Sequence, residues 1–225
     1  MIKIFSNSYL FRAINEYLDL RSLCDTCSLL LKFKKYIFYK LNKQYSLMYY
    51  DDILFRNIFL QKIFNPSKQL HLNLSFCDNI TDVSALGNVY SLNLSYCNNI
   101  IDVSALGNVY AIKLSYCKKL TDVSALSNVH TLILYGCKKL TDVSALSNVH
   151  TLDLSFCDNI TDVSALGNVH TLNLSFCDNI TDVSALTNVH NLDISFCKNI
   201  KDAIVLGNVC NLSFYKKISD ISVLF

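Results

Sequence analysis

The residues in this sequence whose side chains could take part in catalysis are aspartate, serine and histidine, which recur together at fixed intervals. In one copy they are Asp182, Ser184 and His190, the residue types of a hydrolase triad. A triad needs its members within hydrogen-bond reach of one another, whereas these three fall at different positions around a repeating coil. Several copies of one triad would also be unusual in an enzyme. We therefore expect no enzymatic activity, no catalytic residue and no cofactor.

Cysteine is the second candidate for chemistry. The chain has 10 cysteines, and seven of them recur at a spacing of 20 residues from Cys77 to Cys197. The opening residues hold no apolar stretch long enough for a signal peptide, so we expect reduced thiols. A thiol that belongs to an apolar repeat packs as a small apolar group. Cys24 and Cys27 form a lone Cys-x-x-Cys without the second pair of a zinc site, so no metal site is expected.

A column of rings accompanies the repeat. It has one ring per unit, at Tyr90, Tyr110, His130, His150, His170 and His190, and it ends at Cys210. A straight column lacks the convergent geometry that a metal ion needs. We interpret it as stacked surface rings, whose protonation below about pH 6 would make neighbouring histidines repel one another.

These residues are positioned by a 20-residue unit whose cleanest copy, TLNLSFCDNITDVSALTNVH, runs from Thr171 to His190. The unit recurs seven times without insertion over residues 71–210, and a shortened copy covers residues 211–225. Leu172 and Leu174 alternate with polar residues that face outward, which predicts a strand in each unit. Successive strands would stack in parallel.

The return path of each unit is too short for a full helix, so we expect a short 3₁₀ or extended segment at Asp-Val-Ser-Ala-Leu. Asp182 and its equivalents precede this segment and are expected to cap it. Asn188 and its equivalents are expected to satisfy loop backbone groups and to form an internal ladder.

The apolar positions of the unit read L-x-x-L-x-L-x-x-C-x-x-L, which resembles the leucine-rich repeat over about 155 residues. The resemblance implies an α+β protein. Residues 67–225 would form a leucine-rich-repeat solenoid with a parallel β-sheet on its concave face, preceded by a small α-helical region at residues 1–66. It also implies a protein that binds other proteins.

Residues 1–66 differ from the array in charge, because they hold ten Lys and Arg against five Asp and Glu, whereas the remainder holds ten against thirteen. Apolar periodicity predicts one helix around Leu10 to Leu18 and a second from Asp19 toward Tyr36. A third is expected from about Asp52 to Phe64, before Pro66. Its apolar residues include Ile53, Leu54, Ile58, Leu60 and Ile63.

The stretch YLFRAINEYLDLRSLCDTCSLLLKFKKYI, Tyr9 to Ile37, resembles an F-box, the helical module that docks on the Skp-type adaptor of cullin–RING ubiquitin ligases. The following KLNKQYSLMYYDDILFRNIF resembles the segment after the F-box in some giant-virus repeat proteins. The Leu-Pro that usually opens an F-box is missing, because the only proline is Pro66. The resemblance implies that the adaptor is bound by Leu10, Ile14, Tyr17, Leu18, Leu23 and Leu30.

Two functions remain open. In the first, the chain is a substrate receptor that brings a protein target to an SCF-type ubiquitin ligase, through an adaptor bound by residues 1–45. In the second, it is a non-enzymatic binding scaffold whose N-terminal helices only cap the solenoid. We expect a cytoplasmic or nuclear protein, in the host cytoplasm if it is viral. The net charge of +2 without clustered arginine argues against nucleic acid, and the lack of an 18-residue uncharged apolar run argues against a membrane.

Partner contacts are expected where the units differ, because the positions fixed by the coil are nearly identical. The middle unit reads TLILYGC, which puts Ile133 and Tyr135 outward and Gly136 where other units have Phe or Tyr. An outward Ile and Tyr resemble a binding hot spot, although Tyr135 could instead fill the space that Gly136 leaves. The expected partner-binding residues on the concave face, including lysines that would steer an acidic partner, are Lys113, Ile133, Tyr135, Asp153, Lys118, Lys119, Lys138 and Lys139.

Overall fold

The computed structural model describes residues 38–41, 43–60 and 69–215. The chain divides into two compact units, Met1–Leu70 and His71–Phe225. The two helices predicted before Ile37 lie outside the described residues. So do the six residues that the F-box resemblance assigns to adaptor binding: Leu10, Ile14, Tyr17, Leu18, Leu23 and Leu30.

The described part of the first unit contains strand β1 (Phe38–Lys40) and helices α3 (Lys43–Asp51) and α4 (Ile53–Ile58). The predicted third helix starts as expected, because the Asp52 carboxylate accepts the backbone N–H groups of Leu54 at 2.9 Å and Phe55 at 3.0 Å. Helix α3 was not predicted, since its sequence KQYSLMYYD has no clear apolar face.

The buried face of α4 is formed by its aromatic residues. Ile53 and Leu54 are about two-thirds exposed, at 65% and 66%, whereas Phe55 and Phe59 are buried. The Phe59 ring packs edge-on against Tyr49 of α3, with centroids 5.9 Å apart, and Phe55 stacks on Phe59 at 6.2 Å. The aromatic residues therefore decide which face of this short helix turns inward, because they bury more apolar area than the aliphatic ones.

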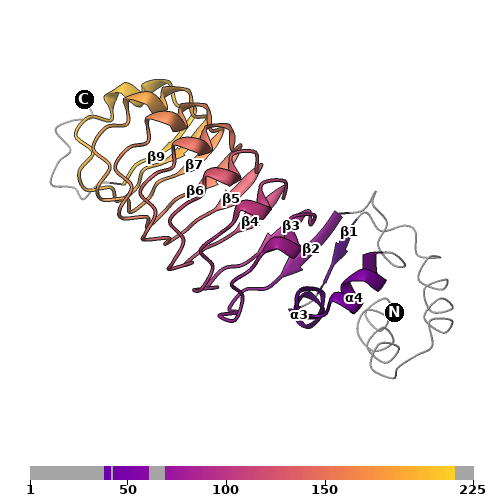
Figure 1. Ribbon diagram of the computed structural model, residues 1–225. Helices are drawn as coiled ribbons and strands as arrows, with labels where there is room; N and C mark the ends of the chain where they lie inside the picture. Colours follow the sequence, from indigo (N-terminus) through magenta and orange to yellow (C-terminus); the bar gives the residue numbers. More distant parts are fainter. Residues whose placement is uncertain (1–37, 42, 61–68, 216–225) are drawn as a thin grey trace. The chain divides into compact units, whose positions relative to one another are not determined.

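The second unit is a stack of coils, each contributing one strand to a parallel sheet (Figure 1). Each strand pairs with the strand of the next coil at a register of 20 residues, as in Leu72 with Leu92 and Leu152 with Leu172. The strands of the coils are β2 (Gln69–Asn73), β3 (Ser91–Asn93), β4 (Ala111–Lys113), β5 (Thr131–Ile133), β6 (Thr151–Asp153), β7 (Thr171–Asn173), β8 (Asn191–Asp193) and β9 (Asn211–Ser213).

The return path of each coil holds a short 3₁₀ helix, which confirms the prediction at Asp-Val-Ser-Ala-Leu. These helices are η2 (Ser84–Leu86), η3 (Ser104–Leu106), η4 (Ser124–Leu126), η5 (Ser144–Asn148), η6 (Ser164–Asn168), η7 (Ser184–Asn188) and η8 (Ile204–Asn208). The predicted contact of the aspartate with this turn is also confirmed, although the N-cap residue itself is Val183. The Asp182 carboxylate accepts the backbone N–H of Ser184 at 2.8 Å.

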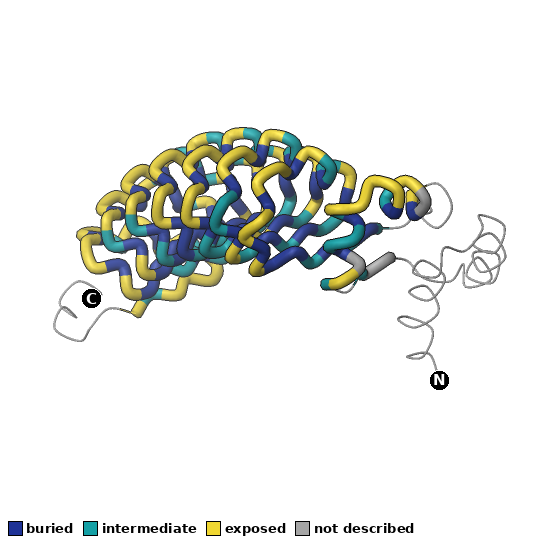
Figure 2. Tube along the Cα trace, turned by 60° about the horizontal axis from the view of Figure 1, so that its bottom comes forward, coloured by how far each residue is buried: buried dark blue, intermediate teal, exposed yellow. Residues whose placement is uncertain are grey.

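The core runs through the middle of the stack as columns of identical apolar residues, one per coil (Figure 2). Leu172, Leu174, Ile180, Val183 and Leu186 and their equivalents up to Ile200 are buried, so the predicted inward positions are confirmed for these coils; Ala203, Leu212 and Phe214, at the end of the array, are only partly covered or exposed. A single coil has no second layer of its own to pack against. Neighbouring coils therefore supply the rest of its core.

The predicted asparagine ladder is at a different position. Asn188 is exposed, and its side chain makes no hydrogen bond within residues 69–215. The ladder is formed instead by asparagines that follow the cysteine turn. The Asn179 amide donates to the Asp158 carbonyl of the preceding coil at 2.6 Å, and Asn99, Asn159 and Asn199 do the same at 2.7 Å.

Candidate functional site

The last residue of each strand from β2 to β8 forms a row across the outer face of the sheet, which we call the strand-end row. Its members are Asn73, Asn93, Lys113, Ile133, Asp153, Asn173 and Asp193. Where the residue is Asn or Asp, its side-chain oxygen accepts the backbone N–H of the serine two residues later, at 2.9–3.2 Å. This short-range bond holds the chain as it leaves the strand.

Lys113 and Ile133 are the two members of the row that cannot form this bond, because neither has a side-chain acceptor. They lie side by side, since Lys113 is in register with Ile133 across β4 and β5. Lys113 is exposed and Ile133 is half-buried. Two adjacent coils therefore lack a local stabilising contact that the other five full coils have.

Sequence reasoning did not include Asp193 among the partner-binding residues, although it is the structural equivalent of Asp153. Asn173 makes the same backbone contact as both aspartates. The negative charge is therefore not needed for the turn. Comparison of Asn and Asp at equivalent positions could have revealed this from the sequence.

The third residue after each strand from β2 to β8 has positive φ, and in six of these seven coils it is aromatic. Phe76, Tyr96, Tyr116, Phe156, Phe176 and Phe196 have φ between 58° and 63°, and Gly136 has φ of 69°. Bulky residues rarely adopt this conformation. Their backbone N–H groups continue the sheet pattern, as in Phe176 N–H to the Ser195 carbonyl at 2.9 Å. The rings stack from coil to coil with centroids 4.2–4.7 Å apart wherever both neighbours have the regular residue.

Gly136 interrupts this aromatic ladder, and Tyr135 restores it. A Cβ atom at Gly136 would lie 2.7 Å from the Tyr116 ring. The Tyr135 ring packs between its neighbours, 4.9 Å from Tyr116 and 5.1 Å from Phe156. A hydrogen bond with Tyr135 raises the pKa of Tyr116 to about 12. Tyr135 therefore takes part in the aromatic ladder, and its contact with a partner stays a prediction.

The column of rings before the strands is stacked as predicted. Tyr90, Tyr110 and the four histidines from His130 to His190 have successive centroids 4.5–4.7 Å apart. The Nδ1 atom of His170 lies 3.2 Å from the Thr171 hydroxyl. Burial, and then the charges of His150 and His190, lower the pKa of His170. His190 thus belongs to a ring stack at the start of a strand, whereas Asp182 and Ser184 bond to each other at the 3₁₀ turn.

The seven repeat cysteines are buried and unbridged, as predicted. Each thiol after the first donates to a leucine carbonyl of the preceding coil, as in Cys157 to Leu134 at 3.2 Å. Burial raises the pKa of Cys137 to about 11 and that of Cys177 to about 12. These thiols are therefore protonated and have little nucleophilic character.

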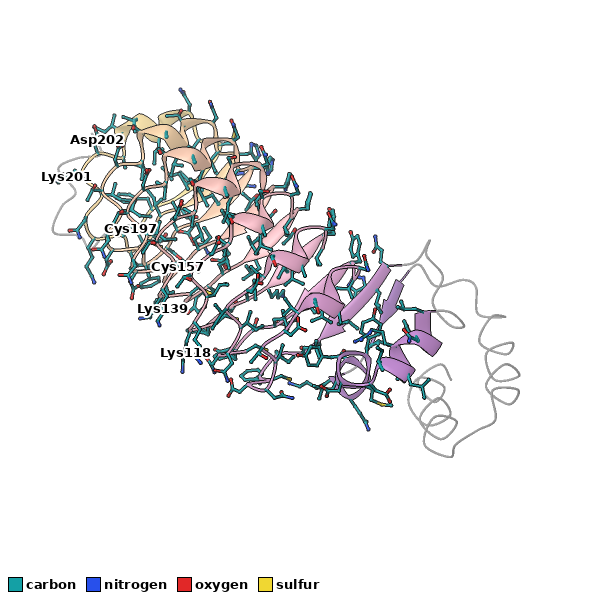
Figure 3. All side chains as sticks on the ribbon, viewed as in Figure 1. Lys118, Lys139, Cys157, Cys197, Lys201 and Asp202 are labelled. Carbon is teal, nitrogen blue, oxygen red and sulfur yellow. The ribbon has the colours of Figure 1, made fainter. Side chains whose placement is uncertain are left out.

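The four predicted lysines lie on the turn after the cysteine column. Lys118 and Lys139 lie along the same edge of the array (Figure 3). All four lysines are exposed, and Lys138 pairs with Asp158 at 2.9 Å. The basic patch is therefore partly neutralised from the next coil.

Within the residues that the structure describes, no group of three or more His, Cys, Asp or Glu side chains could hold a metal ion. The same residues include no helix with the length and apolar character needed to span a membrane.

Three stretches of the array, residues 70–86, 145–167 and 168–187, match the family model described as Leucine Rich repeat. No curated protein matches the chain by sequence. Among solved structures, an internalin (InlF) from Listeria monocytogenes is 25% identical with a TM-score of 0.48, covering 60% of this chain and 44% of that chain. Internalin C2 from the same organism is 21% identical with a TM-score of 0.40, covering 66% and 62%. The functional domain of its InlJ, which includes a cysteine ladder, is 18% identical with a TM-score of 0.36, covering 67% and 44%.

The chain thus spans between 44% and 62% of the length of these internalins. The repeat matches and the observed coil together define the class of the fold. The array is a leucine-rich-repeat solenoid with one parallel sheet, and this prediction from the sequence is confirmed.

Proposed function

We propose that this chain binds a protein partner on the outer face of its parallel sheet, centred on Lys113 and Ile133. The observation that carries the proposal is the strand-end row. Five full coils end their strand with an Asn or Asp that fixes the following turn, and two adjacent coils do not. Local rules of stability are broken where function requires it, so the exception marks the candidate contact centre.

The surroundings of Ile133 support this proposal. Its half-buried side chain lies between charged Lys113 and Asp153 in the sheet register. An apolar residue within a polar rim is the arrangement found in interface hot spots. The exposed Lys118, Lys119 and Lys139 add positive charge at one edge, which would speed the approach of an acidic region of the partner.

The test uses substitutions that the repeat itself supplies. Ile133→Asn introduces the residue present at Asn93 and Asn173, so it restores the turn contact while removing the apolar centre. We expect it to abolish recovery of partners in pull-downs from lysate, and Asn173→Asp to leave recovery unchanged. Equal recovery with wild type and Ile133→Asn would refute this site. Tyr135→Ala is a second variant for comparison with Ile133→Asn, because it removes a ring of the aromatic ladder and not a residue of the strand-end row.

In its more specific form, the proposal assigns the chain to an SCF-type ubiquitin ligase as a substrate receptor. Its support is the sequence of Tyr9 to Ile37, which resembles an F-box. Residues 1–45 would recruit the Skp-type adaptor while the sheet holds the target. The alternative is a scaffold whose N-terminal helices only cap the solenoid. Copurification with a Skp-type adaptor that is lost on deletion of residues 1–45 would support the receptor, and no copurification with the full chain would support the scaffold.

A further inference from the structure

The strand-end row carries a regular pattern of charge. From β4 to β8 its residues are Lys113, Ile133, Asp153, Asn173 and Asp193, so a charged group occurs on every second strand. The first charge is positive and the next two are negative. Parallel strands lie about 4.8 Å apart, so the two aspartates lie about 10 and 19 Å from Lys113 along the row.

These charged groups are not used in ion pairs within the array. Neither Lys113, Asp153 nor Asp193 forms an ion pair with another residue in the described part of the chain. Asp193 makes only the turn contact that Asn173 makes without a charge, and Asp153 adds to this contact a hydrogen bond from the Ser155 hydroxyl, which is neutral. By contrast, Asp158 and Asp178, on the neighbouring turn, are paired with Lys138 and Lys198. The row therefore presents unpaired charges beside a turn edge on which Asp158 and Asp178 are neutralised.

We propose that the partner bound at this face is an extended segment with an acidic residue opposite Lys113 and basic residues opposite Asp153 and Asp193. This inference rests on the proposed function and names the chemistry of its partner. A polyproline II segment rises about 3.1 Å per residue and has three residues per turn, so it repeats one edge every 9.3 Å. Its residues i, i+3 and i+6 match the three charges of the row.

The aromatic ladder beside the row fits the same occupant. It begins three residues beyond each strand-end residue, and Phe176 and Phe196 keep 37% and 51% of their surface exposed. Segments in polyproline II conformation bind along surfaces lined by aromatic side chains. Ile133 would contact the residues between the acidic and the first basic position.

The experiment selects partners without prior assumption. A display library of random 12-residue peptides is selected against the full chain, and the enriched peptides are synthesised. We expect an acidic residue followed by basic residues three and six positions away, in either chain direction. Selection against Lys113→Asp should replace the acidic residue by a basic one, because Asp occupies the equivalent position in β6 and β8.

The affinity of a selected peptide is then measured for wild type, Lys113→Asn, Asp153→Asn and Asp193→Asn. Each variant introduces the residue of a neighbouring coil and keeps or restores the turn contact. We expect each to weaken binding about two- to fivefold at low salt, the range of exposed ion pairs, and the effect to vanish at high salt.

The outcomes separate this inference from the proposed function. Binding that is lost in Ile133→Asn but unchanged in the three charge variants overturns the charge pattern and leaves the binding face in place. Enrichment of charges at the helical spacing of seven residues overturns the extended partner. A selection that enriches no sequence, or sequences indifferent to all four positions, overturns both.

Discussion

Gly136 and Tyr135 show how a single residue position can be strained and yet retained. The position after each strand requires positive φ, and six coils place a Phe or Tyr there. Holding a bulky residue in this region costs roughly 1 kcal/mol or more, which the stacking of neighbouring rings offsets. The fourth coil has the unstrained glycine and takes its ring from the residue before it.

This exchange of positions predicts that a second substitution restores the stability that the first one removes. Gly136→Phe alone places a second ring where Tyr135 already packs, and we expect it to destabilise the array by about 1–3 kcal/mol, as overpacking does. The double variant Tyr135→Ser, Gly136→Phe recreates the sequence of the neighbouring coils and should return the unfolding midpoint close to that of wild type. Urea unfolding followed by circular dichroism measures both. Equal midpoints for the single and double variants would show that the two residues are not coupled.

The cysteine column allows a second prediction at this scale. Burial raises the pKa of Cys177 to about 12 and that of Cys197 to about 11, so the reactive thiolate is scarce at neutral pH. Cys210 is exposed. Brief treatment of the native protein with iodoacetamide at pH 8, followed by peptide mass spectrometry, should label Cys210 and leave Cys177 and Cys197 unmodified. Labelling in urea is the control, since unfolding should make all three react.

At the scale of elements, the two ring columns follow from the 20-residue register, which places equivalent side chains on adjacent strands. A column of tyrosines has one charge state near neutral pH, whereas a column of histidines does not. The stack therefore changes character along its length, from Tyr90 and Tyr110 to the four histidines.

The histidine part should make stability depend on pH. Burial and the neighbouring His150 and His190 lower the pKa of His170, whereas in the unfolded chain it titrates near 6.5. The unfolded state therefore binds more protons as the pH falls through about 6.5, so stability is present above that pH and is lost below it. We expect the Tm to fall between pH 7.5 and pH 5. The aspartate caps do not titrate in this window, because hydrogen bonds from serine lower the pKa of residues such as Asp142 and Asp182.

His170→Tyr is the matched control for this prediction. Tyr90 and Tyr110 stack at the same position with centroids 4.6 Å apart, so the variant keeps a ring in the column. Its Tm should fall less than that of wild type over the same range. A wild-type Tm that is constant from pH 8 to pH 5 would exclude the mechanism.

The elements also show what the sequence could predict. The alternation of Leu172 and Leu174 is sufficient for a strand, and the 20-residue period is sufficient for parallel stacking, because both follow from the spacing of apolar residues. The side-chain ladders are harder to predict from the sequence than the strands. Asn179, and not Asn188, bonds to the preceding coil, since reaching a carbonyl depends on turn geometry that apolar spacing does not encode. The positive φ of the aromatic position was signalled only by Gly136, the one coil where glycine replaces the ring.

At the scale of the whole molecule, the array places equivalent residues at a constant spacing. Every coil advances the chain by one strand spacing and contacts its neighbours in the same way. The coils can therefore differ at exposed positions without disturbing the core. The order of the coils sets the distance between Lys113 and each aspartate of the strand-end row. Any partner that pairs with these charged groups must match that distance.

Deletion of one coil tests both the stability of the array and the dependence of partner binding on the spacing of its charges. Deletion of residues 171–190 joins His170 to Asn191 in the same frame of the 20-residue unit, so the columns of leucine and cysteine continue. Stability in a solenoid is approximately a sum over coils and their interfaces, and we expect a folded but less stable array. Far-ultraviolet circular dichroism and thermal melting check this part of the prediction.

The same deletion shortens the distance between Lys113 and Asp193 from four strand spacings to three, or from about 19 Å to about 14 Å. Peptides selected against this variant should lose the basic residue six positions from the acidic one, because about 14 Å corresponds to between four and five residues of a polyproline II segment, which presents the same edge only every third residue. Deletion of residues 91–110 is the matched control. It removes one coil of equal length outside the interval and should leave the spacing at six. If both deletions leave the selected spacing unchanged, the partner does not read the charges of this row, and its contacts lie on another part of the sheet.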